Sequence, residues 1–326
     1  MKRNAGMKRV AAFILVFMFA FVSVFAVSPS TAFAAAKRPA KVKGVKAVAK
    51  SSSSIKITWK KTKNAKKYLV FRATRKNGKY KKVKTTTKRS FVNKSLKAEK
   101  KYFYKVRAIN GKKKGAFSSK VSAKTKKKTA LEQVEVNTAA KTVTISAKVN
   151  GTYFKESTRH LMVDRDGFNA GKAILTSYCS PVDLYNGLVK AGGVSWSKSA
   201  DKTLKMASGS KKGEKISEAN AENKNYSSMD VMISWADKSY GLSEVLTTEK
   251  GGSKAPKINM VFSGNPGAAK KTPSGCMVCL DSCYIGIVSN DKYGCCDIDE
   301  GNPTVFARKD ILPADGTVVK VTFTLK

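Results

Sequence analysis

Apolar and polar side chains alternate in short runs along residues 37–128. The clearest runs cover residues 55–59, 68–71 and 102–108, and no segment between them shows helical periodicity. Such alternation is typical of half-buried antiparallel strands. The pair Asn77-Gly78 separates two runs and predicts a type I′ hairpin turn, in which both residues have positive φ. We therefore expect an all-β immunoglobulin-like sandwich of about 90 residues.

The pattern beyond residue 131 is mixed. Alternating runs at 143–149, 231–235, 258–262 and 319–325 predict further strands. One helix is expected after Ser180, because Pro181 suits the first helical position, Asp183 completes a capping box and Gly192-Gly193 ends the apolar pattern. The C-terminal domain should thus have a β-rich α+β fold.

The N-terminus has the pattern of an export signal. Four basic residues precede an apolar run from Val10 to Val27, and Ala32-Phe33-Ala34 provides a small-residue cleavage pattern. We therefore assign residues 1–36 to a signal peptide and the mature protein to a secreted or cell-envelope location. The alternative is an uncleaved membrane anchor, because a run of eighteen residues is just long enough to span a bilayer.

Charge divides the rest of the chain sharply. Residues 37–128 carry 35 basic side chains and a single acidic one, Glu99, whereas residues 129–326 carry 25 basic and 21 acidic side chains. One globular unit rarely segregates charge in this way. We therefore expect a sandwich domain at 37–124, a basic linker at 125–130 and a second domain at 131–326.

The basic surface predicts an anionic partner. For an exported protein the available polyanions are cell-wall polymers and the acidic membrane surface. Nucleic acid is not expected in vivo, because export separates it from the protein and the aromatic residues are expected to lie in the core. The alternative is a surface that only keeps the protein dispersed by self-repulsion.

The first domain resembles the fibronectin type III family. The resemblance rests on Pro39, Trp59, Tyr68-Leu69-Val70 and the spacing of Leu96 from Tyr102. It implies a spacer or binding module, with the Tyr102 phenol bonded to upstream backbone as a tyrosine corner.

Motifs for catalysis are scarce in the second domain. It has no phosphate-binding loop, dinucleotide fingerprint or nucleophile elbow. Its one histidine, His160, could act as a base or a ligand, but an isolated histidine is more often structural. Enzymatic activity is therefore not predicted.

The cysteines carry the most informative chemistry. Cys276, Cys279 and Cys283 lie within eight residues, and Cys295 or Cys296 could complete a set of four ligands. Thiolates in such a set suit an iron–sulfur cluster or zinc. Disulfides are the alternative, because exported chains with an even number of cysteines usually oxidise them. The sixth cysteine, Cys179, lies about a hundred residues upstream.

The second domain resembles the YdjY-like family, some of whose members are described as ferredoxin-like. The resemblance rests on Thr158-Arg159-His160, on the helix after Ser180 and on residues 276–290. It implies a cluster, although Tyr284 replaces the proline of a bacterial ferredoxin loop. Two functions follow as hypotheses: an envelope-associated binding protein, or an extracytoplasmic electron-transfer protein with a redox partner.

The secreted protein is predicted to begin at Ala35 or Lys37, because the small-residue cleavage pattern ends there. The intact mass of the exported chain measures this directly. A membrane-bound chain that keeps residues 1–27 would show instead that the apolar run is an anchor.

Overall fold

The computed structural model describes residues 37–219, 223, 225–272 and 274–326. The signal peptide predicted for residues 1–36 lies outside this part of the chain. Within the described residues, no helix is both long and apolar enough to cross a membrane.

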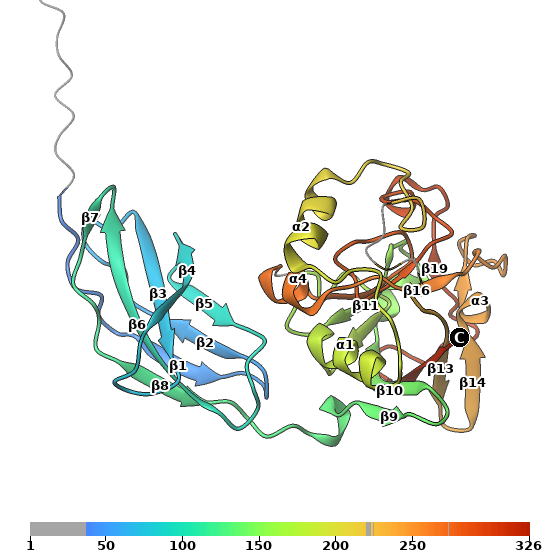
Figure 1. The fold of residues 1–326 in the computed structure, drawn as a ribbon, viewed down its shortest axis with the longest axis horizontal. Helices are drawn as coiled ribbons and strands as arrows, with labels where there is room; N and C mark the ends of the chain where they lie inside the picture. Colours follow the sequence, from blue (N-terminus) through green and yellow to red (C-terminus); the bar gives the residue numbers. More distant parts are fainter. Residues whose placement is uncertain (1–36, 220–222, 224, 273) are drawn as a thin grey trace, which may run out of the picture. The chain divides into compact units, whose positions relative to one another are not determined.

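The N-terminal region forms two antiparallel sheets (Figure 1). One sheet has the order β1-β2-β5, and the other has the order β4-β3-β6-β7 with β8 also paired to β6. The bounds are β1 Lys46–Ala49, β2 Ile55–Thr58, β3 Lys67–Ala73, β4 Lys81–Thr86, β5 Ser90–Asn93, β6 Lys101–Asn110, β7 Lys113–Lys114 and β8 Val121–Lys124. The expected all-β sandwich is confirmed.

The core of this sandwich comes from the alternating positions. Trp59 and Tyr68 pack with ring centroids 5.4 Å apart, and alternate residues of β6 are buried beside them. The backbone N–H of Lys97 donates a hydrogen bond to the Tyr102 hydroxyl at 3.0 Å. This is the bond to upstream backbone that the tyrosine-corner spacing predicted.

The predicted type I′ turn is wrong. Residues 74–80 connect β3 to β4, and neither Asn77 nor Gly78 has a positive φ. A seven-residue connection does not need the left-handed conformations that a two-residue turn imposes.

The expectation that all aromatic residues lie in the core is also wrong. Four of them are half-buried and lie outside the core cluster: Phe71, Tyr80, Phe103 and Phe117. Phe71 and Phe103 occupy the outward positions of β3 and β6, where side chains alternate away from the core. The outer face of this sheet therefore combines aromatic and basic side chains.

The C-terminal region is β-rich, with a barrel-like sheet. The strand order β12-β11-β17-β18-β16-β13-β20-β10 closes because β10 also pairs with β12, while β9 and β14 are appended to β10 and β13. The bounds are β9 Glu135–Asn137, β10 Thr142–Val149, β11 His160–Asp164, β12 Leu175–Ser177, β13 Ser228–Trp235, β14 Lys238–Gly241, β16 Met260–Phe262, β17 Cys276–Cys279, β18 Val288–Asn290 and β20 Val318–Leu325. A small separate sheet pairs β15 Leu246–Thr247 with β19 Phe306–Ala307.

A few short helices accompany these strands. The α-helices are α1 Pro181–Lys190, α2 Ala200–Gly209, α3 Leu242–Val245 and α4 Pro266–Lys271, and the 3₁₀ turns are η1 Ala130–Glu132, η2 Gly151–Phe154 and η3 Ile298–Glu300. The helix predicted after Ser180 is confirmed as α1, with Ser180 and Asp183 forming its capping box and Gly192 beyond its end at φ +97°.

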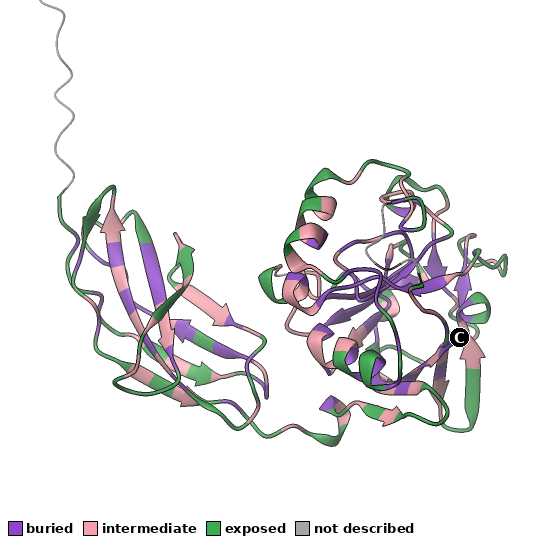
Figure 2. Cartoon of the chain, viewed as in Figure 1, coloured by how far each residue is buried: buried purple, intermediate pink, exposed green. Residues whose placement is uncertain are grey.

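One large hydrophobic core unites the strands of the C-terminal region with α1 (Figure 2). Strands β11, β17 and β18 are buried along their whole length. Burial on both faces explains why these strands show no alternation of apolar and polar residues. The ferredoxin-like arrangement implied by the family resemblance is not confirmed.

The absence of a side chain at Gly187 is predicted to allow the close packing of α1. A Cβ at this position would lie 2.8 Å from Val134 Cγ1 and 3.0 Å from Val143 Cγ1. The Gly187→Ala variant gains about 1 kcal/mol of helix propensity but suffers overpacking of typically 1–3 kcal/mol. We expect a net destabilisation of up to about 2 kcal/mol in denaturant unfolding.

The matched control is Gly209→Ala at the end of α2, where an added Cβ meets no atom within 4 Å. This variant should be neutral or slightly stabilised. Equal effects of the two substitutions would contradict the packing argument.

Candidate metal centre

The site begins with the pairing of β11 and β17. The two strands are antiparallel, with His160 opposite Cys279 and Val163 opposite Cys276. In a regular strand, residues three apart point to opposite faces. Two register irregularities interrupt this ladder, and such irregularities re-aim side chains. As a result, one ligand atom from each of His160, Cys276 and Cys279 lies within 4.8 Å of the others.

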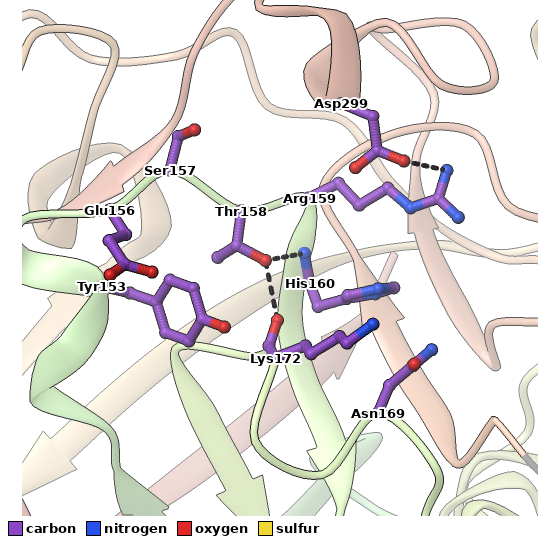
Figure 3. A pocket seen from close by; sticks show the side chains of 9 residues that line it. All are labelled: Tyr153, Glu156, Ser157, Thr158, Arg159, His160, Asn169, Lys172 and Asp299. Atoms are coloured by element: carbon purple, nitrogen blue, oxygen red, sulfur yellow. Dashed lines mark hydrogen bonds and ion pairs between the residues drawn. The ribbon is translucent and has the colours of Figure 1, made fainter.

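His160 is held in place by its own strand. Its Nδ1 lies 3.9 Å from Cys276 Sγ, and only 7% of the residue is exposed. Its backbone N–H donates to the Thr158 hydroxyl, which in turn donates to the Lys172 carbonyl (Figure 3). These bonds fix the backbone from which the imidazole projects.

Cys283 lies next to this group, on the loop that follows β17, although it is not among the residues whose ligand atoms all lie within 4.8 Å. Its thiol is within hydrogen-bonding reach of Cys279, which also contacts Cys276. The backbone N–H of Gly286 donates to Cys283 Sγ at 3.3 Å, and the Ser289 hydroxyl donates to the Cys283 carbonyl at 2.9 Å. Cys279 thus lies between the other two thiols.

The ionisation of the buried thiols is coupled. Hydrogen bonding from Cys279, assisted by His160, lowers the pKa of Cys276 well below its ordinary value. The same bond, the contact with Cys283 and burial all raise the pKa of Cys279. Hydrogen bonding to the charged form therefore favours ionisation of Cys276 over that of Cys279.

Arg159 brings positive charge to the sulfur atoms. Its Nη1 lies 3.0 Å from an Asp299 carboxylate oxygen, 3.7 Å from the buried Asp281 and 3.4 Å from Cys296 Sγ. Burial opposes its charge, but Asp281 and Asp299, with Cys279 and Cys283, raise the pKa of Arg159 above its ordinary value. The guanidinium is therefore a fixed cation next to the thiols.

The other three cysteines lie elsewhere. Cys295 and Cys296 have their sulfurs 3.2 Å apart, and among the described residues the group within 4.8 Å contains neither of them. Cys179 is buried at the start of α1 beside Ser177, where burial raises its pKa to about 12. All six cysteines are free thiols.

A polar pocket opens beside His160 (Figure 3). Its volume is about 340 Å³, and it is lined by Tyr153, Glu156, Ser157, Thr158, Arg159, His160, Asn169, Lys172 and Asp299. Asn169 also reaches Cys276, with its Nδ2 3.9 Å from Sγ. His160 and Asn169 thus line the pocket and also contact the buried Cys276.

Of the predicted site, the structure brings Cys276 and Cys279 together and adds His160, whereas Cys283 contacts Cys279 but lies outside the group within 4.8 Å. Sequence reasoning favoured a structural role for His160 because an isolated histidine is more often structural, and in the chain it lies 116 positions before Cys276. The resemblance included Thr158-Arg159-His160, which was the one signal that this segment belongs to the site.

Comparison with known proteins gives two family matches. The family model of the YdjY domain matches residues 134–324, and that of the fibronectin type III domain matches residues 40–124. The uncharacterized protein YdjY of Escherichia coli (strain K12) is 33% identical over 185 residues, which cover 55% of this chain and 73% of that protein.

Fibronectin type III structures are among the solved structures that resemble part of the chain. The crystal structure of FN3tt is 22% identical and covers 28% of this chain and 99% of its own, with a TM-score of 0.26. An Fn3-like protein from Clostridium thermocellum is 25% identical, covers 29% of this chain and 98% of its own, and has a TM-score of 0.25.

Proposed function

The chain belongs to the YdjY domain family, with a fibronectin type III domain before the family domain, and from the geometry of the sulfur group we propose that this domain binds one zinc ion. The ligands are Cys276, Cys279, Cys283 and His160. The carrying observation is that His160, Cys276 and Cys279 present their ligand atoms within 4.8 Å of one another.

The distances favour a single ion. Tetrahedral zinc with Zn–S bonds of about 2.3 Å and Zn–N bonds of about 2.0–2.1 Å separates its ligand atoms by roughly 3.5–3.8 Å. The His160–Cys276 distance of 3.9 Å is close to this value. An iron–sulfur cluster is bound by thiolates on several iron atoms and is usually held by four cysteines. A group of three cysteines and one histidine therefore fits a single zinc ion better than a cluster.

The surroundings fit the charge of such a site. Three thiolates, a neutral imidazole and Zn²⁺ carry one net negative charge, which the Arg159 guanidinium can balance. The N–H of Gly286 and the amide of Asn169 supply outer hydrogen bonds to Cys283 and Cys276. Outer partners of this kind orient ligands and tune a metal site.

A set of four protein ligands is typical of structural zinc. Bound zinc would tie the loop after β17 to strands β11 and β17, and its binding free energy would add to the free energy of folding. In this proposal the C-terminal region is a metal-stabilised binding domain, and electron transfer remains the alternative only if iron is found.

We further propose that the fibronectin type III domain holds the exported protein on anionic envelope polymers. Lys105 Nζ lies 4.0 Å from the ring centre of Phe117 and 4.6 Å from that of Tyr80. Arg107 covers Phe117 at 4.4 Å and Phe71 at 5.6 Å. These cation–π contacts order the basic groups on the outer sheet face, which favours adhesion over a surface that serves only solubility.

Metal analysis tests the zinc proposal. The wild-type protein, prepared without oxygen, should contain one zinc and no iron per chain. We expect each single replacement of a ligand to lower zinc affinity by roughly 100-fold or more, because loss of an outer hydrogen-bond partner alone typically costs about 10–100-fold. The variants are Cys276→Ser, Cys279→Ser, Cys283→Ser and His160→Gln.

Cys179→Ser, Cys295→Ser and Cys296→Ser are the matched controls and should retain zinc. Loss of metal in a Cys295 or Cys296 variant would show that this cysteine is the fourth ligand, as expected from the sequence, and would contradict the assignment of His160. Wild-type protein without zinc or iron would refute a metal centre.

Salt dependence tests the adhesion proposal. The mature chain should bind vesicles of acidic lipid or purified anionic wall polymer, and the affinity should fall steeply with salt, because screening shortens the reach of exposed charges to about 10 Å at 0.1 M ionic strength. Binding that is indifferent to salt would contradict the mechanism.

A charge-matched pair of double variants locates the binding face. Lys105→Glu with Arg107→Glu should weaken binding more than Lys112→Glu with Lys113→Glu, which changes exposed residues near the β6–β7 turn by the same charge. Equal losses would show that only net charge matters, and tighter binding of nucleic acid than of wall polymer would identify a different partner.

A further inference from the structure

The adjacent thiols of Cys295 and Cys296 form a second sulfur site that the zinc proposal does not use. Their Sγ atoms are 3.2 Å apart, and both residues are half-buried. They lie between β18 and η3, and Cys296 has a left-handed backbone with φ +70°. Two thiols in contact can be oxidised together without movement of distant segments.

The turn that carries the pair is well fixed. The N–H of Cys295 donates to the Glu214 carbonyl at 2.8 Å, and the Cys295 carbonyl accepts from Gly213 at 3.0 Å. The N–H of Cys296 donates to the buried Asp281 carboxylate at 3.2 Å. The two side chains are thus held on the same side of a constrained backbone.

We propose that Cys295 and Cys296 form a reversible vicinal disulfide by exchange with an external disulfide. Across a trans peptide, adjacent Cα atoms are about 3.8 Å apart, whereas ordinary disulfides need about 4.4–6.8 Å. The bond is therefore strained, and strained disulfides have oxidising potentials and are readily reduced again. This places the pair among labile, exchangeable disulfides.

The order of the steps follows from the surroundings. Burial first, and then the contact with Cys296, raise the pKa of Cys295 to about 12, which makes it the poorer nucleophile. Arg159 donates a hydrogen bond to Cys296 Sγ at 3.4 Å and holds this sulfur in position. Cys296 is therefore the attacking residue.

The chemistry is a balanced two-electron exchange. The Cys296 thiolate attacks one sulfur of the external disulfide, forms a mixed disulfide and releases one thiolate, which takes up a proton. The Cys295 thiol then loses its proton and attacks Cys296 Sγ, which releases the second thiol. The pair loses two hydrogens and the external disulfide is reduced to two thiols.

The cysteine pair contains none of the ligands in the zinc proposal. The pair lies outside the ligand group, and Arg159 contacts Asp281 and Asp299 as well as Cys296. The disulfide is read from mass, whereas zinc is read from elemental analysis, so either proposal can fail alone.

Mass spectrometry of one tryptic peptide tests the inference. Cleavage after Lys292 and Arg308 releases residues 293–308, in which Cys295 and Cys296 are the only cysteines. The full mature protein is treated with oxidised glutathione, and free thiols are alkylated. We expect this peptide to be unalkylated and lighter by two hydrogens, and to regain two alkylation sites after mild reduction.

Three results would overturn the inference. They are a doubly alkylated peptide after oxidant treatment, two glutathione adducts on it, or a cross-link to a peptide that carries Cys276, Cys279 or Cys283.

Single variants test the order of attack. Cys295→Ser should trap one stable glutathione adduct on Cys296, because the resolving thiol is absent. Cys296→Ser should leave Cys295 largely unreacted, and faster labelling of Cys295 than of Cys296 would reverse the assigned roles. Cys179→Ser should give the wild-type peptide, since Cys179 lies at α1.

Discussion

The candidate site depends on the irregular pairing of strands β11 and β17. A regular antiparallel ladder would turn Cys276 and Cys279 to opposite faces, whereas the two register irregularities beside His160 and Val163 allow their sulfurs to converge. Both strands are buried, so the site sits inside the core of the domain. A buried group of thiols and an imidazole must be satisfied by hydrogen bonds, protons or a metal ion.

Charge connects the two sulfur sites. Arg159 contacts Cys296, Asp281 and Asp299, and its charge also acts on Cys279 and Cys283. One guanidinium therefore lies next to both groups of sulfur atoms. The residues that precede His160 in sequence contribute to both sites. Thr158 fixes the backbone, Arg159 supplies the cation and His160 supplies the nitrogen ligand in our proposal.

The local elements could be predicted from the sequence. Short-range rules were enough for several features, and the structure agrees with them. These features are the capping residues of α1, the alternation in β6, β10 and β20, and the spacing of Leu96 from Tyr102. The closeness of Cys276 and Cys279 followed from their positions along the chain, and Cys283 contacts Cys279. These features need no knowledge of how distant strands pair.

The remaining features depend on long-range pairing. His160 reaches Cys276 only through the β11–β17 ladder, and the β10–β12 pairing that closes the sheet joins segments with no shared sequence signal. Phe71 and Phe103 lie in the same alternating strands as the core residues but point outward. The sequence does not show which face of each strand is buried, so these two aromatic residues were expected in the core. The Asn77-Gly78 turn failed because a longer loop connects β3 and β4.

X-ray absorption at the zinc edge tests the central claim most directly, because it counts the atoms bound to the ion. For the zinc-loaded protein the account predicts three sulfur neighbours at about 2.3 Å and one nitrogen neighbour at about 2.0–2.1 Å. Four sulfur neighbours would place Cys295 or Cys296 at the metal instead of His160. A neighbouring metal atom in the same spectrum would contradict a single-ion centre.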